Sequence, residues 1–220
     1  MGAATHLGIK LHDYDAVIRT LIPHYAELIG AAAAAVGALA RTAPAVVDLG
    51  TGSGALAQAI LKARPRARLI GIDDDRGMLA MAENRLRGRI QTVEGNFERT
   101  AIPRCDVVAA SFALHHIPTG RRKAALYKHC FAALRPGGML VSADCCLAAS
   151  TALQQAHRAG WLQHLQAHYP RAKAAGYLRT WAKEDVYFTL DREVELLREA
   201  GFSVEIAFRK TCFAVVVGLK

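Results

Sequence analysis

This chain of 220 residues has few cysteines and no long apolar run, and each of these absences excludes some classes of protein. The five cysteines are odd in number and show no Cys-x-x-Cys spacing, so we expect reduced thiols rather than a disulfide framework or a zinc site. The apolar run Gly30–Ala40 is too short to span a bilayer, and no basic segment precedes it as in a signal peptide. We therefore expect a cytoplasmic protein that makes no membrane contact. With 52% hydrophobic residues, the chain can bury one sizeable core.

From Pro44 onward, short apolar stretches alternate with segments of helical pattern. The predicted strands are Ala45–Leu49, Arg68–Asp73, Arg89–Glu94, Asp106–Ser111 and Gly138–Ala143. The predicted helices between them are Ala55–Ala63, Gly77–Leu86 and Thr119–Leu134. This alternation is typical of βαβ units, and continuously apolar strands are typical of a parallel sheet covered on both faces. The sequence thus predicts an α/β fold.

The two ends and one long segment depart from this alternation. A helix over Arg192–Ala200 precedes strands Ser203–Phe208 and Cys212–Val217, whose tight connection predicts a hairpin and therefore one antiparallel strand. Leu11–Ala40 reads as helices interrupted at Pro23, and Cys145–Leu190 is a long insertion. We expect one domain, composed of a helical cap (1–43), a core (44–144), a lid insertion (145–190) and a final helix and hairpin (191–220).

The turn after the first strand lacks one glycine of the dinucleotide pattern Gly-x-Gly-x-x-Gly. Glycines stand at Gly50, Gly52 and Gly54, and the position of the third dinucleotide glycine holds Ala55. Glycines with positive φ let a backbone approach a ligand closely, and the following helix offers unpaired N–H groups. At the end of the second strand, the carboxylate of Asp73 can accept hydrogen bonds from a ribose diol.

Five motifs in order carry a resemblance to a known family. They are VVDLGTGSG, GIDDDRGML, VEGNF, DVVAASFALHH and LRPGGMLVSAD. Together with the terminal hairpin, they resemble class I S-adenosylmethionine (SAM)-dependent methyltransferases over nearly the whole chain. The resemblance implies a Rossmann-like, seven-stranded, mostly parallel sheet with one antiparallel strand. It also implies SAM as cofactor and S-adenosylhomocysteine (SAH) as product.

The resemblance implies a set of cofactor-binding residues. In that family the glycine turn lines the methionine part, the carboxylate in the first strand supports the turn and reaches the ammonium through water, and an amide and an aromatic ring flank the adenine. By position, the implied residues here are Tyr25, Asp48, Gly50, Thr51, Gly52, Gly54, Asp73, Asp74, Met78, Asn96, Phe97, Ser111 and Phe112. Many relatives have Asp where Asn96 stands, but an amide retains both a donor and an acceptor.

Within the family, the chain resembles carboxy-SAM synthases and small-molecule methyltransferases. The shared segments are IPHYAELI, SFALHHI and FAVVVGLK. Carboxy-SAM synthases place an arginine in the last helix to hold a carboxyl group, and this chain has Leu196 at the matching place. The resemblance therefore favours ordinary methyl transfer over carboxy-SAM synthesis.

Three residues at strand ends are candidates for catalysis. His115 and His116 follow the fourth strand, where an imidazole of near-neutral pKa can accept a proton from the substrate. The alternative for His115 is packing of the loop. Asp144 ends the fifth strand and either orients the acceptor or caps the strand.

The insertion offers a possible metal pair and a possible aromatic box. His164 and His168 have helical i, i+4 spacing, but no third ligand is evident, so we expect no metal. Trp161, Trp181 and Tyr187, with Tyr177, either form an aromatic substrate box or pack the lid.

The chain has an excess of basic residues, with a formal net charge of +9, which can indicate a nucleic-acid partner. Most of its clustered arginines, however, fall in helix-to-strand turns near Arg66 and Arg87, at the edge of the sheet opposite the cofactor. Only Arg121, Arg122 and Lys123 begin a helix on the cofactor side. The sequence therefore favours a methyltransferase acting on an O, N or S atom of a small molecule. The alternatives are a tRNA-modifying enzyme and a SAM enzyme of non-methylating chemistry such as cyclisation, and a homodimer is possible in each case.

Overall fold

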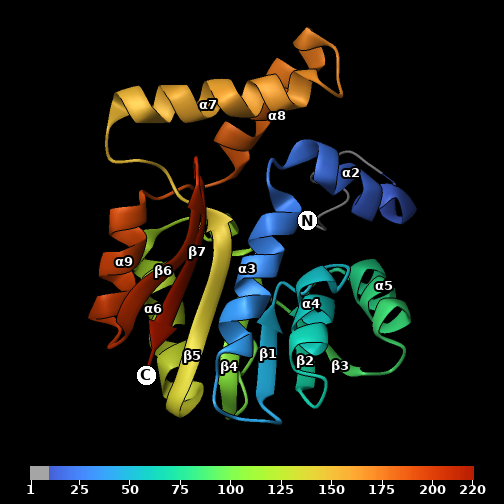
Figure 1. Ribbon diagram of the computed structural model, residues 1–220, viewed down its shortest axis with the longest axis vertical. Coiled ribbons are helices and arrows are strands. Elements are labelled where there is room, and N and C mark those ends of the chain that lie inside the picture. The colour runs from blue at the N-terminus through green and yellow to red at the C-terminus, as the bar shows by residue number, and fades with distance from the viewer. Residues whose placement is uncertain (1–9) are drawn as a thin grey trace.

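The computed structural model describes residues 10–220, which form a seven-stranded sheet flanked by helices (Figure 1). The strands are β1 (Ala45–Leu49), β2 (Arg68–Asp73), β3 (Ile90–Glu94), β4 (Cys105–Ser111), β5 (Leu134–Cys145), β6 (Ser203–Lys210) and β7 (Phe213–Leu219). Their order in the sheet is β3-β2-β1-β4-β5-β7-β6. Strand β7 pairs antiparallel with β5 and β6, and the other pairs are parallel. The predicted fold class is confirmed.

Helices cover both faces of the sheet, which explains why its strands are almost continuously apolar. Helices α3 (Tyr25–Gly37), α4 (Ala55–Ala63) and α5 (Arg76–Leu86) lie on one face, and α6 (Gly120–Ala133) and α9 (Leu190–Glu199) lie on the other (Figure 1). Neighbouring strand residues alternate between the two cores. Val46 belongs to the cluster beneath α3 and α4, whereas Val47 belongs to the cluster beneath α6 and α9.

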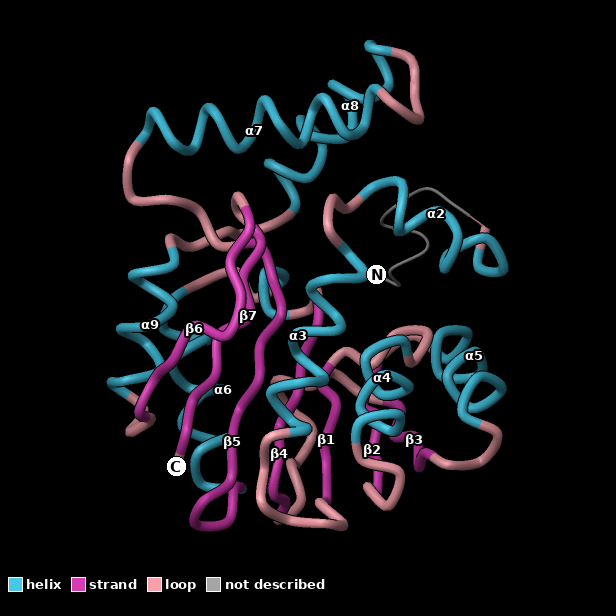
Figure 2. The backbone as a smooth tube through the Cα atoms, viewed as in Figure 1, coloured by secondary structure: helices cyan, strands magenta, loops and turns pink. Residues whose placement is uncertain are grey.

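The cap and the insertion lie together beyond the carboxyl ends of the parallel strands (Figure 2). The part of the predicted cap that lies here comprises the 3₁₀ turn η1 (Leu11–Asp13) and α2 (Tyr14–Leu21). Helix α2 ends before Pro23, where the interruption was predicted, and α3 of the same predicted segment packs against the sheet. The insertion forms α7 (Thr151–Gln166) and α8 (Arg171–Glu184). The indole Nε1 of Trp161 donates to the carbonyl of Leu21 at 2.8 Å, which ties α7 to the cap. The two segments therefore form one cover over the sheet edge.

Several strand boundaries differ from the prediction, and those of β5 and β7 have clear causes. Strand β5 begins at Leu134, four residues early, because Leu134 pairs with Cys105 across an irregularity in the β4–β5 ladder. Strand β7 begins at Phe213 because the hairpin turns at Thr211 and Cys212, and Thr211 takes the left-handed φ of 54°. Within residues 10–220, no helix has both the length and the apolar character needed to cross a membrane.

Candidate active site

The turn between β1 and α4 has the left-handed backbone that its glycines predict. Gly50, Gly52 and Gly54 have φ values of 64°, 52° and 78°. A Cβ on Gly50 would lie 2.6 Å from the Cβ of Ala113, so the loop after β4 closes directly over this turn. A Cβ on Gly54 would instead meet Ala82 at 3.1 Å. Gly54 therefore allows α4 to pack on α5, whereas Gly50 keeps open the space between two loops.

Replacing Gly50 with alanine is expected to lower the affinity for SAH at least tenfold. The added Cβ must displace the loop that carries Ala113, in addition to the strain of a left-handed alanine, about 1–2 kcal/mol. Gly88→Ala is the matched control, because Gly88 has a φ of 75° and no atom within 4 Å of its added Cβ. Calorimetric titration with SAH checks this. Equal losses of affinity in both variants would contradict a special role for Gly50.

Asp48 is the carboxylate beneath the turn, and it is 1% exposed. Thr51 donates its hydroxyl to one oxygen, Oδ2, at 2.8 Å. The other oxygen, Oδ1, is buried without a hydrogen-bond partner among the described residues. Burial raises the pKa of Asp48 to about 7. The hydrogen bond from Thr51 lowers this pKa, and the negative charge of Asp73 raises it further. An orphaned carboxylate oxygen at this point fits a cationic group such as the ammonium of SAM.

Asp73 stands at the carboxyl end of β2 and is held by two backbone donors. The N–H of Gly52 donates to its Oδ2 at 2.8 Å, and the N–H of Asp75 donates to its Oδ1 at 2.9 Å. Partial burial raises the pKa of Asp73, although these two hydrogen bonds act to lower it. The carboxylate is thereby fixed between the first turn and the helix that follows, where a ribose diol can reach its remaining lone pairs.

The opposite wall of the same space is aromatic. Phe112 follows β4 with a φ of 49°, which is rare for a bulky residue and strained. Its ring stacks on Tyr25 of α3 at a centroid distance of 5.6 Å and an interplanar angle of 18°. The resulting cofactor cleft is lined by Tyr14, Tyr25, Gly50, Thr51, Gly52, Ser53, Ala55, Asp73, Asp74, Phe97, Ser111, Phe112, Ala113 and His116.

The structure brings most of the predicted cofactor residues to this cleft, but not all of them. Asn96 is exposed, and its Oδ1 accepts the N–H of Glu98 at 3.0 Å, so its amide shapes the turn that carries Phe97. Met78 is fully buried in the first turn of α5. Tyr14 and Ser53 line the cleft without having been predicted. Ser53 donates to Asp15 of the cap at 2.7 Å, a contact between distant segments that no local motif announces.

Asp144 and His115 form a buried pair after the fourth and fifth strands. The Nδ1 of His115 lies 2.6 Å from Oδ1 of Asp144. The other oxygen of Asp144 accepts the backbone N–H groups of Leu114 and His115 at 3.1 and 3.2 Å. Asp144 lines none of the cavities described here, so its contacts are those of a strand-end cap, and it orients His115 from beneath.

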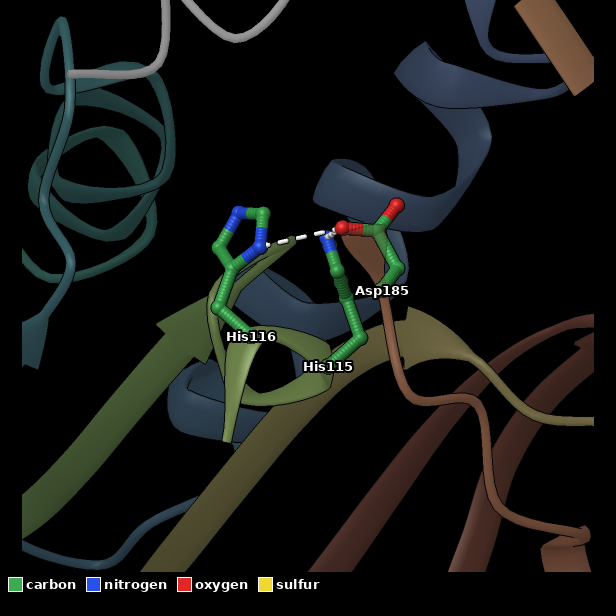
Figure 3. Close-up of side chains that lie close together, drawn as sticks. All are labelled: His115, His116 and Asp185. Atoms are coloured by element: carbon green, nitrogen blue, oxygen red, sulfur yellow. Dashed lines mark ion pairs between the residues drawn. The ribbon is translucent and has the colours of Figure 1, made fainter. Parts of the chain in front are cut away.

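His116 and Asp185 form a second pair that reaches the cleft (Figure 3). The Nδ1 of His116 lies 3.1 Å from Oδ1 of Asp185, and the Nε2 of His115 lies 3.9 Å from the same oxygen. Tyr187 donates its hydroxyl to the other oxygen of Asp185 at 2.6 Å. No sequence motif points to Asp185, because it lies at the end of the insertion and meets the histidines only through the fold.

Charges within this cluster compensate one another. Burial alone lowers the pKa of His115, but Asp144 and Asp185 more than offset it, so the pKa is raised. The pKa values of both carboxyl groups are lowered, because the histidines outweigh the effect of burial. Such a cluster can hold and transfer protons at a cavity wall. Atoms of His115, His116 and Asp185 also lie within 4.8 Å of one another, a spacing at which a divalent cation can bind.

Two further cavities continue from the cofactor cleft. The smaller one, of about 50 Å³ and called the neck, shares Tyr14, Phe112 and His116 with the cleft. The larger one, of about 500 Å³ and called the lid cavity, lies under α7 and α8. The residues that line both the neck and the lid cavity are Cys145, Trp161, Trp181, Asp185 and Tyr187. The three spaces thus adjoin one another through shared walls, and the His116–Asp185 pair stands where they meet.

The sheet has this strand order with a reversed β7. A glycine turn follows β1, and a carboxylate stands at the carboxyl end of β2. Together these features define a Rossmann-like nucleoside-binding enzyme. A family model described as a methyltransferase domain matches residues 46–138. An uncharacterized methyltransferase of Geobacillus kaustophilus is 26% identical over 96% of this chain and 90% of its own length. A carboxy-S-adenosyl-L-methionine synthase of Chromohalobacter salexigens is 29% identical over 93% of this chain and 78% of its own.

Solved structures show the same fold. The pyocyanin biosynthetic protein PhzM superposes with a TM-score of 0.67 at 23% identity, covering 99% of this chain and 63% of its own. Human N-acetylserotonin methyltransferase, solved in complex with SAM, superposes with a TM-score of 0.61 at 18% identity. The match covers 95% of this chain and 65% of that chain. This chain therefore spans less than two thirds of the length of either solved chain. The family-model match, the relatives and the shared fold all support the prediction of a class I SAM-dependent methyltransferase.

Proposed function

We propose that this enzyme transfers the methyl group of SAM to an O, N or S atom of a small molecule held in the lid cavity. One observation carries the proposal. The neck lies between the lid cavity and the cofactor cleft and shares wall residues with each, and an imidazole held by a carboxylate stands at the junction. A small acceptor that enters under α7 and α8 meets the cofactor there, away from bulk water.

The chain's own residues position the cofactor in this proposal. When bound, SAM supplies a methyl group already activated on a sulfonium. Asp73 holds the ribose, the turn at Gly50 and Gly52 carries the methionine part, and Asp48 faces the ammonium. The stacked rings of Tyr25 and Phe112 keep water away. Methyl transfer is a displacement at the methyl carbon. Its main requirements are that the acceptor atom, the methyl group and the sulfur are aligned and that water is excluded.

His116 accepts the proton of the acceptor. When its Nδ1 donates to Asp185, the basic lone pair of the ring is at Nε2. Tyr187 and the backbone hold Asp185 in turn: its own N–H donates to the carbonyl of Trp181 at 2.8 Å. Asp144 and His115 stabilise the loop on which His116 stands. The predicted catalytic set of His115, His116 and Asp144 is therefore proposed with divided roles, His116 touching the acceptor and the other two positioning it.

The affinity for SAH is expected to rise as the pH rises through about 7. In the free protein, Asp48 has a pKa of about 7, so it is mostly protonated below that value. The ammonium of SAH favours the carboxylate, so the affinity falls by up to about tenfold per pH unit below pH 7 and levels off above it. Calorimetry from pH 5.5 to 8.5 measures this. Asp48→Asn should give a flat profile, and a flat profile in the unmodified protein would contradict the role of Asp48.

Incubation with methyl-labelled SAM and a panel of small phenols, amines and thiols tests the proposed function. Label in a small molecule with equal formation of SAH supports it, and label found only in RNA contradicts it. The charge distribution agrees with a small acceptor. Arg66, Arg68 and Arg89 line a surface hollow at the amino ends of β2 and β3, at the end of the sheet opposite the cleft.

Carboxylation of SAM is the second candidate, because carboxy-S-adenosyl-L-methionine synthases are among the relatives that match most of the chain. Leu196, at the place of the arginine that holds a carboxyl group in those enzymes, is 1% exposed and packs in the core beneath α6 and α9. An apolar side chain there provides no counter-charge for a carboxylate. Mass spectrometry separates the two candidates, since methyl transfer yields SAH and carboxylation yields SAM heavier by the mass of CO₂.

A further inference from the structure

We infer that the acceptor is a planar aromatic molecule that carries its hydroxyl or amino nucleophile at one end and an anionic substituent at the other. The inference rests on the proposed function for the identity of the reaction, but its support comes from the cavities. Three features support it: the rings of the walls, the small volume of the neck, and the distribution of charge along the lid cavity.

Three aromatic rings, those of Trp161, Trp181 and Tyr187, line the lid cavity among aliphatic and polar side chains. Trp161 and Trp181 lie with their ring centroids 5.4 Å apart, and both are at least 92% buried. Tyr177 stacks on Trp181 at 5.4 Å and 16°, and Trp161 is held by its hydrogen bond to Leu21. Rings locked by neighbours keep their shape in the absence of ligand. They give the cavity rigid walls that are partly aromatic, which favours a flat, polarisable acceptor over an aliphatic one of equal size.

The neck limits which part of the acceptor reaches the methyl group. The lid cavity, at about 500 Å³, is in the range of small-molecule sites, whereas the neck measures about 50 Å³. Only a substituent passes the neck, and the ring stays in the lid cavity. At the neck, Asp185 and His116 are acceptors for a proton, so the substituent that enters is a donor such as a hydroxyl or amino group.

Polar groups are distributed unequally along the lid cavity. Asp185 is the one acidic residue among those lining it and lies at the neck, whereas Arg158 is the one basic residue of Lys or Arg type and lies on α7. His157 lines the same side and has a buried Nδ1 without a hydrogen-bond partner among the described residues. The remaining polar residues on this side are Thr151, Gln154 and Gln155. The side formed by α7 therefore suits an anionic or hydrogen-bond-accepting substituent, such as a carboxylate.

Matched probes test the inference with the SAH-bound enzyme. The probes are mono- and bicyclic hydroxyarene and aminoarene carboxylates, each paired with its ring-saturated analogue and with the arene lacking the carboxylate. Binding is followed by quenching of tryptophan fluorescence, and turnover by formation of SAH from SAM. At least one arene carboxylate should bind tenfold or more tightly than both of its partners. If no arene exceeds its saturated analogue, the inference is wrong.

Arg158→Gln separates the charged contact from general effects on the lid. It should raise the Kd and KM of the best arene carboxylate about tenfold and leave those of the arene without a carboxylate unchanged. Arg179→Gln, an exposed arginine of α8 that lines none of the three spaces, is the matched control and should change neither. Equal effects of the two substitutions would overturn the assignment of the anionic end.

The two proposals fail in distinguishable ways. Methylation of aliphatic acceptors, without preference for rings, would retain the proposed function and reject the aromatic acceptor. Tight, carboxylate-dependent binding of arenes without formation of SAH from any acceptor would retain the aromatic site and reject methyl transfer as its reaction.

Discussion

Asp185→Asn is expected to lower the kcat of methyl transfer by about 10²- to 10⁴-fold, the usual contribution of a positioned acid or base. Asp185 orients His116 through the 3.1 Å contact between Oδ1 and Nδ1, and its charge stabilises the imidazolium that forms when His116 takes a proton. An amide can hold the ring but supplies no negative charge. The effect should appear in kcat, because Asp185 does not line the cofactor cleft.

Steady-state kinetics and SAH calorimetry on the same samples check this prediction. The Kd for SAH should stay within about twofold of its original value, and Asp191→Asn, an exposed carboxylate in the first turn of α9, should leave kcat unchanged. Unaltered kcat in Asp185→Asn would show that the proton leaves by another route. Activity that disappears with a chelator and returns with a divalent cation would assign the cluster to a metal instead.

Asp73→Asn is expected to weaken SAH binding at least 100-fold. The carboxylate accepts N–H groups from Gly52 and Asp75 and, in the proposed complex, the ribose hydroxyls. An amide turns its NH₂ group toward one of these donors, so at least two charge-assisted hydrogen bonds are lost. At about 1.5–3 kcal/mol each, their loss exceeds the roughly 2.7 kcal/mol that correspond to a factor of 100.

Asp74→Asn is the control for this substitution, because Asp74 is exposed at the rim of the same cleft and should affect affinity less than fivefold. Thermal unfolding without ligand distinguishes loss of binding from loss of fold. Comparable losses at both positions would point to a general electrostatic effect of the rim rather than to a specific ribose contact.

The parts of the site that the sequence predicted depend on local backbone requirements. Gly50 and Gly52 needed positive φ, and Asp73 ended a strand whose carboxyl edge is fixed by parallel pairing, so their places followed from spacing alone. Phe97 and Phe112, which the family resemblance implied, also lie just beyond the ends of β3 and β4. In each case the residue lies within a few positions of a strand end, and the parallel sheet brings these strand ends together at one edge.

The parts that could not be predicted depend on contacts between segments far apart in the chain. Asp185 belongs to the end of the insertion and is brought to His116 by the packing of α7 and α8 on the cap. Asn96 illustrates the opposite case, because its position after β3 suggested a ligand contact, but its side chain bonds to the backbone of its own turn. The contacts of Asp144 likewise include two backbone N–H groups that no motif specifies, and they favour the interpretation of Asp144 as a strand-end cap.

A crystal structure with SAH tests the central claim most directly. The account predicts the ribose on Asp73, the homocysteine part along Gly50 and Gly52, its ammonium above Asp48, and the sulfur facing the neck beside His116. A nucleoside bound elsewhere, or a sulfur turned away from the neck so that no path leads to the lid cavity, would contradict it.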